Sequence, residues 1–136
     1  MKRKRLLAQI AFVVFFFTLL YSCYSDYLNL DKHYVVVDYQ AQDIWIGIDN
    51  DGADIDVWPN TTDAEYSNEY VIGDSVYNVG DWFKVILNRK DPMHIVISVD
   101  ENQTEKDRSV LVGVHRNVDG DTVRIIQEAK PNLSMD

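Results

Sequence analysis

Cysteine is almost absent from the 136-residue chain: the only one is Cys23, which follows an apolar N-terminal stretch. A small secreted domain stabilised by disulfides needs cysteines in pairs, so this class of scaffold is excluded. The three histidines have no H-x-H or H-x-x-x-H spacing, so the sequence gives no sign of a zinc site. The fold must therefore rest on its hydrophobic core, and we expect no cofactor.

Basic residues are also scarce. The chain has 13 Lys and Arg against 22 Asp and Glu, a formal net charge of −9. Four of the basic residues lie at positions 2 to 5, so a chain that loses its leader keeps nine basic residues against 22 acidic ones, a balance of −13. Such a surface repels nucleic-acid phosphates and anionic membranes. We therefore expect no nucleic-acid partner.

A long apolar run occurs only near the N-terminus. Residues 10 to 20 form an apolar stretch of 11 residues behind the basic start. This length fits the roughly 7–15 residues of a secretory signal core and is short of the about 20 residues that span a membrane. We expect residues 1 to 22 to be a cleaved signal helix. An uncleaved N-terminal membrane anchor is the alternative.

The junction at residues 20 to 23 has the sequence Leu-Tyr-Ser-Cys. It resembles the lipobox of bacterial lipoproteins, in which Leu and small residues precede a cysteine that becomes acylated, here with the bulkier Tyr21 at one small position. The Phe-rich leader is similar to those of Bacteroidetes. The resemblance implies that Cys23 is the lipidation site and that its acyl chains hold the protein in a membrane. Because Tyr24 rather than Asp follows, it also implies the outer membrane, on the periplasmic or the surface face.

After a polar tether at residues 23 to 32, strand patterns begin. Residues 43 to 48 alternate, with isoleucines on one face and Trp45 on the other, and residues 53 to 58 alternate in the same way with Trp58 facing outward. The Asp-Asn-Asp-Gly sequence between them is typical of a tight turn, so we predict a hairpin. The branched residues that we expect to face inward are Ile44, Ile46, Ile48, Ile55, Val57, Ile95, Ile97, Val99, Val110, Val112, Val114, Val123 and Ile125.

The rest of the chain continues this pattern. Residues 33 to 38, 81 to 88, 94 to 99, 108 to 116 and 122 to 127 are further predicted strands, and residues 59 to 80 are irregular, with a short strand expected near 70 to 72 or 75 to 79. About seven or eight short strands without helical periodicity predict an all-β protein, an immunoglobulin-like antiparallel β-sandwich. We expect this domain at residues 33 to 130 and a C-terminal tail at 131 to 136.

A family resemblance covers residues 82 to 127. The matching parts are the Trp-Phe pair at 82 and 83, the strand at 95 to 99, Asn102, Thr104, Arg108, the valine strand at 109 to 114, and residues 123 to 127 ending in Gln127. Together they resemble the BACON domain, a sandwich module of Bacteroidetes envelope proteins. The resemblance implies an accessory or spacer module in glycan handling. Arg108 and Gln127 are expected to fix the fold rather than to bind a ligand.

Aromatic residues give the best indication of a binding site. Sugars are held by flat aromatic faces, and the aromatic residues of this chain lie in and around the irregular segment at residues 59 to 80. Irregular loops of this length are uncommon in compact domains and are often functional. Some large rings, above all Trp82, are expected in the core. The candidate ligand-binding residues are Trp45, Trp58, Tyr66, Tyr70 and Tyr77.

The densest carboxylate cluster consists of Asp49, Asp51, Asp54 and Asp56. Hard oxygen ligands favour calcium, but an EF-hand loop does not fit because Gly47 and Trp58 would occupy ligand positions. We expect a solvated turn and no metal, with a weak surface calcium site at these four residues as the alternative.

No stretch has the pattern of an active site. The G-x-S-x-G motif is absent, and no pair among the acidic residues stands out for glycoside hydrolysis. We therefore expect a non-enzymatic, acylated envelope lipoprotein that binds a glycan or a partner protein. The alternative is a structural spacer or assembly subunit of an envelope complex, with no small ligand.

Overall fold

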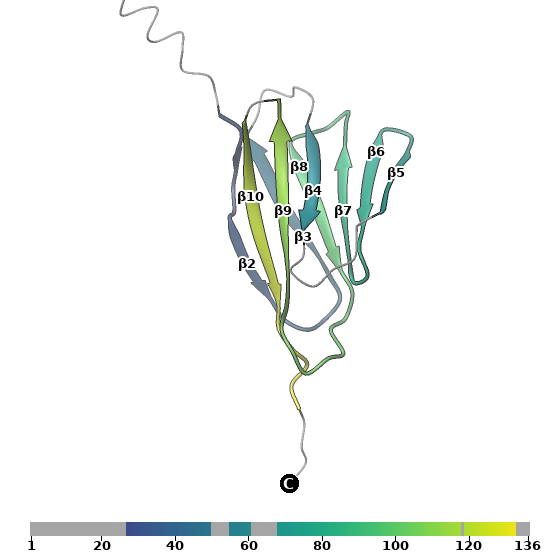
Figure 1. Cartoon of the computed structure of the whole chain (residues 1–136), viewed down its shortest axis with the longest axis vertical. Coiled ribbons are helices and arrows are strands. Elements are labelled where there is room, and N and C mark those ends of the chain that lie inside the picture. The colour runs from purple at the N-terminus through teal and green to yellow at the C-terminus, as the bar shows by residue number, and fades with distance from the viewer. Residues whose placement is uncertain (1–26, 50–54, 61–67, 118, 133–136) are drawn as a thin grey trace, which may run out of the picture.

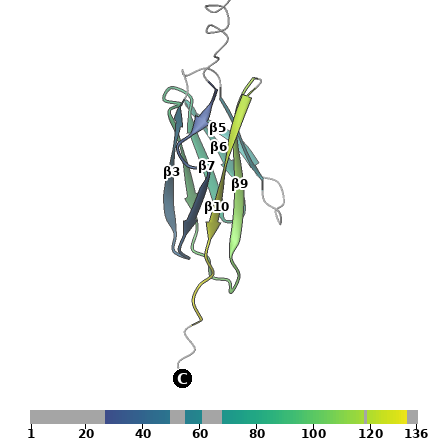
Figure 2. The same cartoon turned by 90° about the vertical axis from the view of Figure 1, so that its left-hand side faces the viewer.

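The computed structural model describes residues 27–49, 55–60, 68–117 and 119–132. In these ranges the chain forms ten β-strands in two sheets that pack face to face (Figures 1 and 2). The predicted all-β sandwich is therefore confirmed, with more strands than expected. No helix within the described ranges is long and apolar enough to cross a membrane. The predicted signal helix at residues 1 to 22 lies outside them.

One sheet has six strands and the other has four. The six-stranded sheet has the order β1-β3-β8-β7-β6-β5, and the four-stranded sheet has the order β2-β10-β9-β4. The strands of the larger sheet are β1 (Asn29–Leu30), β3 (Gln42–Asp49), β8 (His94–Val99), β7 (Phe83–Asn88), β6 (Ser75–Val79) and β5 (Asn68–Ile72). Those of the smaller sheet are β2 (Tyr34–Val37), β10 (Asp119–Gln127), β9 (Arg108–Arg116) and β4 (Asp56–Asn60).

The core is a layer of branched aliphatic side chains between the two sheets. All thirteen residues predicted to face inward are buried, and Phe83, Val85 and Leu87 of β7 join them. Alternation explains this, because every second residue of a strand points to the same face of its sheet. The opposite face of each strand is therefore directed away from the core.

The predicted hairpin of residues 43 to 58 is wrong. β3 pairs with β1 and β8 in the six-stranded sheet, whereas β4 pairs with β9 in the four-stranded sheet. Both strands bury their Ile and Val faces in the same core, but from opposite sides. The alternation predicted these faces correctly; it does not distinguish two strands in one sheet from two strands that face each other across a core.

The N-terminal strand passes from one sheet to the other. It pairs antiparallel with β3 as β1 and then parallel with β10 as β2, so the sandwich is not purely antiparallel. The crossing is close: the Asp31 carboxylate accepts a hydrogen bond of 2.8 Å from the Gly47 amide. A Cβ at position 47 would lie 3.0 Å from this carboxylate, so a residue larger than glycine would push Asp31 away.

The predicted tether also contains part of the domain. Leu28 and Leu30 are 4% and 1% exposed and belong to the core. The sequence pattern of residues 23 to 32 does not reveal this, because a two-residue strand is too short for its alternation to be recognised. The folded domain therefore begins before residue 33.

The irregular segment contains a hairpin rather than one short strand. β5 and β6 pair along five residues each, and Gly73 between them has a φ of 59°, a conformation that glycine adopts at little cost. All five residues of β5 are exposed, and this hairpin extends to the right of β4 in Figure 1. The larger sheet therefore projects beyond the smaller one at this edge.

Two carboxylates of β10 hold the start of the folded chain. The Asp119 side chain accepts a hydrogen bond from the Leu28 amide, and Asp121 accepts one from the Leu30 amide, both at 2.8 Å. Hydrogen bonding from Arg116, and then from Leu28, lowers the pKa of Asp119. Burial tends to raise the pKa of Asp121, but hydrogen bonds from the Leu30 and Thr122 amides and from His33 outweigh it, so its pKa is also lowered.

Acid is expected to weaken this attachment. A carboxyl whose pKa is lower in the folded state stabilises the fold above its unfolded pKa of about 3.9, and this stabilisation is lost as the pH falls through the folded pKa. Asp121→Asn should reduce the free energy of unfolding by about 1 kcal/mol at pH 7, in view of the partial exposure of the site. It should also lessen the loss of stability below about pH 4.

Urea unfolding at several pH values measures both effects. Asp91→Asn, a change at an exposed carboxylate between β7 and β8, is the control and should behave like the wild type. Equal acid sensitivity of Asp121→Asn and wild type would contradict the role given to Asp121.

Candidate functional site

Cross-strand pairing brings five apolar residues into one line across the six-stranded sheet. Tyr70 pairs with Tyr77, Tyr77 with Ile86, Ile86 with Val96, and Val96 with Trp45. Residues directly opposite each other on neighbouring strands point to the same face, and these alternate with the buried residues of each strand. We call Tyr70, Tyr77, Ile86, Val96 and Trp45 the aromatic row. It lies on the outer face of the sheet and crosses β5, β6, β7, β8 and β3.

The two ends of the aromatic row are its most exposed parts. Trp45 is 57% exposed and Tyr70 is 42% exposed, whereas the other three residues are half-buried. Ile72, also in β5, is 63% exposed beside Tyr70. The row is therefore a continuous apolar surface that no other described segment covers.

The rings at each end have defined neighbours. The Tyr70 and Tyr77 rings stack with their centroids 5.0 Å apart and their planes within 7° of each other. The Trp45 indole lies against the His94 imidazole with a centroid distance of 4.7 Å and a 36° angle between the planes. Such packing limits the rotamers of exposed rings, so less entropy is lost when a ligand contacts them.

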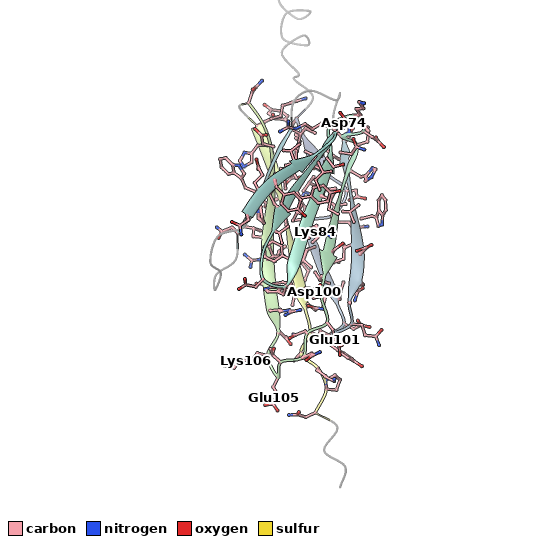
Figure 3. The ribbon with its side chains drawn as sticks, turned by 90° about the vertical axis from the view of Figure 1, so that its right-hand side faces the viewer. Asp74, Lys84, Asp100, Glu101, Glu105 and Lys106 are labelled. Carbon is pink, nitrogen blue, oxygen red and sulfur yellow. The ribbon has the colours of Figure 1, made fainter. Side chains whose placement is uncertain are left out.

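Polar side chains border the row on both sides. Register places Lys84 of β7, Ser98 of β8 and Asp43 of β3 opposite one another on one side, where the Ser98 hydroxyl donates a hydrogen bond to Asp43. Asn88 and His94 lie on the other side, two residues along β7 and β8. Lys84 lies about midway along the long axis, between Asp74 at one end and the charged loop around Glu105 at the other (Figure 3). The centre of the sheet therefore offers hydrogen-bonding groups next to apolar ones.

The predicted binding residues do not all belong to one surface. Trp45, Tyr70 and Tyr77 come together in the aromatic row, but Trp58 lies on the outer face of the four-stranded sheet, on the other side of the sandwich. Trp58 is 64% exposed, and its ring packs on His115 at a centroid distance of 4.3 Å. A single site formed by all these rings is therefore excluded by the topology. Tyr66 lies outside the described residues.

The outer face of the four-stranded sheet has exposed apolar residues but no continuous row. Tyr34 pairs with Arg124, so a charged residue follows it across the sheet, and Trp58 pairs with Gly113, which has no side chain. Val36 and Ile126 stand opposite each other, but Ser109 follows Ile126 on the next strand, so no apolar row crosses the whole sheet. This contrast makes the six-stranded sheet the better candidate.

The structure does not bring the four candidate calcium ligands together within the described residues. Asp49 ends β3 in one sheet and Asp56 begins β4 in the other, whereas Asp51 and Asp54 fall in the gap at 50–54. No group of three or more His, Cys, Asp or Glu in the described part of the chain is arranged to hold a metal ion. Cys23 also lies outside the described residues.

Arg108 and Gln127 act inside the fold, as the sequence predicts. The fully buried Gln127 donates hydrogen bonds to the carbonyls of Tyr39, Gln40 and Asp100 and accepts one of 2.9 Å from Arg108. The Arg108 guanidinium lies 4.4 Å from the centroid of the Trp82 ring, and burial lowers its pKa although Asp100 partly opposes this. Trp82 itself packs against the core. These residues therefore connect strand ends and loops.

Sequence reasoning missed Ile86 and Val96 as site residues. Alternation in β7 and β8 would have predicted that both side chains face outward, because the adjacent Leu87 and Ile95 face the core. The missing information was the register, because only the pairing of β3 with β8 and of β8 with β7 puts them in line with Trp45.

No family model matches the chain. No curated protein matches it. Among solved structures, the NMR structure of a protein from Bacteroides thetaiotaomicron is similar over 79% of this chain and 92% of that one, with 16% identity and a TM-score of 0.53. A GH5 xyloglucanase from Bacteroides ovatus, in complex with a XXXG heptasaccharide, is similar over 80% of this chain and 20% of the enzyme, with 16% identity and a TM-score of 0.49.

At this identity the NMR structure supports the sandwich fold alone.

Proposed function

We propose that the chain is a non-enzymatic binding module of the bacterial cell envelope, and that it binds a glycan or a partner protein through the aromatic row. The observation that carries this proposal is the alignment of five outward-facing apolar residues across five strands. Continuous exposed apolar surface with a polar border is typical of interaction sites. The core does not need these rings, because its own residues lie on the opposite face of the same strands.

We also propose that the domain is BACON-like. Three of the residues that carry the resemblance make hydrogen bonds that connect parts of the fold. Arg108 donates one to Gln127, and the side-chain amide of Asn102 donates to the Lys106 and Glu128 carbonyls. Asn102 and Gln127 are both fully buried. If BACON-like domains share these buried polar residues, they can keep the same sandwich fold while their surface residues differ.

Anchoring is proposed through an acylated Cys23 in the outer membrane. The Leu28 amide is already held by Asp119, so few residues separate the cysteine from the folded domain. The sandwich would therefore stay close to the membrane surface. Its acidic character would keep it off anionic headgroups.

A spacer or assembly subunit is the second candidate. The first and last described segments, at residues 27 and 132, lie at opposite ends of the long axis (Figure 1). A module built in this way holds the groups attached at its two ends apart by the length of the sandwich. This function requires no ligand on the aromatic row.

Two tryptophans on opposite faces allow a matched test. Trp45→Ala and Tyr70→Ala should weaken binding to a glycan array or to an identified envelope partner by about tenfold or more, because each removes an exposed ring of the row. Trp58→Ala, the control, should bind like the wild type. Each change should alter the free energy of unfolding by less than about 1 kcal/mol, since the three residues are 42% to 64% exposed and none belongs to the core.

Binding assays and thermal unfolding are measured on the same preparations. Equal binding by all three variants and wild type would contradict the proposed surface and would favour the spacer. A large loss of stability in Trp45→Ala would instead make this ring part of the fold.

The anchor has its own test. Cells given labelled palmitate should incorporate it into the wild-type protein but not into Cys23→Ala, because acylation needs the thiol. The wild type should fractionate with the outer membrane. Ser25→Ala, close to the junction, is the control and should be labelled normally. Absence of label from the wild-type protein would refute the lipoprotein assignment.

A further inference from the structure

Over β7, β8 and β3 the aromatic row is a stripe one residue wide, whereas Val79 and Ile72 widen it over β6 and β5. Its neighbours on the same strands, two positions away, are polar over β7, β8 and β3: Lys84, Ser98 and Asp43 on one side, and Asn88 and His94 on the other. Positions two residues apart along a strand are separated by about 6.6 Å. Over these three strands the surface is therefore an apolar line between two hydrogen-bonding lines, and it runs across the strands.

A chain of equatorially linked pyranose rings has the matching pattern. Its ring faces carry C–H groups, and its two long edges carry hydroxyls. If such a chain lies along the stripe, its ring faces meet Trp45, Val96, Ile86 and the tyrosines, and its hydroxyls meet the polar borders. Strands are about 4.8 Å apart, close to the length of one pyranose unit, so each strand of the row would meet one ring.

An axially linked chain does not fit this surface. Its successive rings turn in a helix, so their faces and hydroxyls do not stay on the same side over five strands. A protein partner with an apolar patch would contact the stripe but would have no reason to match both polar borders.

Charge restricts the glycan further. The protein carries a net charge of −9, and Asp43 lies directly at the edge of the stripe. Lys84 is the lysine in the bordering polar lines, and Ser98 lies between it and Asp43. A polyanionic glycan would therefore be repelled on approach, so the ligand is uncharged.

Sheet twist limits the physical form of the ligand. Adjacent strands rotate by about 20–25° relative to one another, so the stripe turns gradually along its length. A single chain in solution can follow this turn. The flat face of a crystalline polysaccharide cannot, because its chains are held in parallel layers.

We infer that the aromatic row binds a single, soluble, uncharged glycan chain with equatorial linkages of the β-1,4 type, lying across β3, β8, β7, β6 and β5. This inference rests on the proposed function and specifies its ligand. Trp45 would lie at one end of the binding site and the Tyr70–Tyr77 pair at the other.

Titration calorimetry of the purified full-length protein with oligosaccharides of defined length tests the inference. The probes are β-1,4-linked gluco-, manno- and xylo-oligosaccharides of two to six units, with α-1,4-linked gluco-oligosaccharides and oligogalacturonates as controls. At least one β-1,4 series should bind, with affinity that rises up to about five units and then levels off, because five strands carry the row.

Variants identify the surface in the same experiment. Trp45→Ala should lower the affinity for the longest oligosaccharide by about tenfold and flatten its dependence on length, because one end of the site is lost. Trp58→Ala should leave both unchanged. Insoluble crystalline polysaccharide should not retain the protein.

The outcomes separate this inference from the proposed function. If no oligosaccharide binds but an identified envelope protein does, and Trp45→Ala abolishes that binding, the proposed binding function is supported and the inferred glycan ligand is wrong. Equal affinity for α-linked or anionic chains, or the same loss in Trp58→Ala as in Trp45→Ala, also overturns the inference. If neither glycan nor protein binds the row, both proposals fail.

Discussion

The rest of the structure depends on one constraint: every core strand directs one of its two faces into the same layer of aliphatic side chains. Ile46, Ile95 and Ile97 are fully buried, and a shift of one residue in β3 would place Trp45 in the core and Ile46 in water. The register that protects the core is therefore the same register that aligns the aromatic row. The proposed binding surface needs no loop of its own, since the sheet itself holds its residues in place.

Buried polar contacts then fix how the two sheets and their connections meet. Gln127 joins β10 to the segment around Tyr39 and to the loop at Asp100, and the β10 carboxylates hold the N-terminal strand at the other end. Breaking one of these contacts leaves buried carbonyls or amides without partners, which is unfavourable. These residues are accordingly part of the fold, and residues on the outer faces of the two sheets can differ without disturbing them.

Much of this organisation could be predicted from the sequence, because strand alternation and the direction of Trp45 and Trp58 depend on local pattern. The strand partners could not, since β3 and β4 have the same alternation whether they form a hairpin or face each other across the core. The site was predicted only in part for the same reason. Trp45 and Trp58 are similar in sequence context, and only the topology puts them on opposite faces, whereas Ile86 and Val96 joined the row through register alone.

The outer face of the six-stranded sheet is the proposed binding surface. Mapping of backbone amide chemical shifts during titration with a β-1,4-linked hexasaccharide tests it most directly, because each strand reports separately. We predict shifts at Trp45, Tyr77, Ile86 and Val96 and at the bordering Lys84 and Ser98, with β2, β4, β9 and β10 unchanged. Shifts that cluster around Trp58 and Tyr34, or no shifts at all, would contradict this assignment.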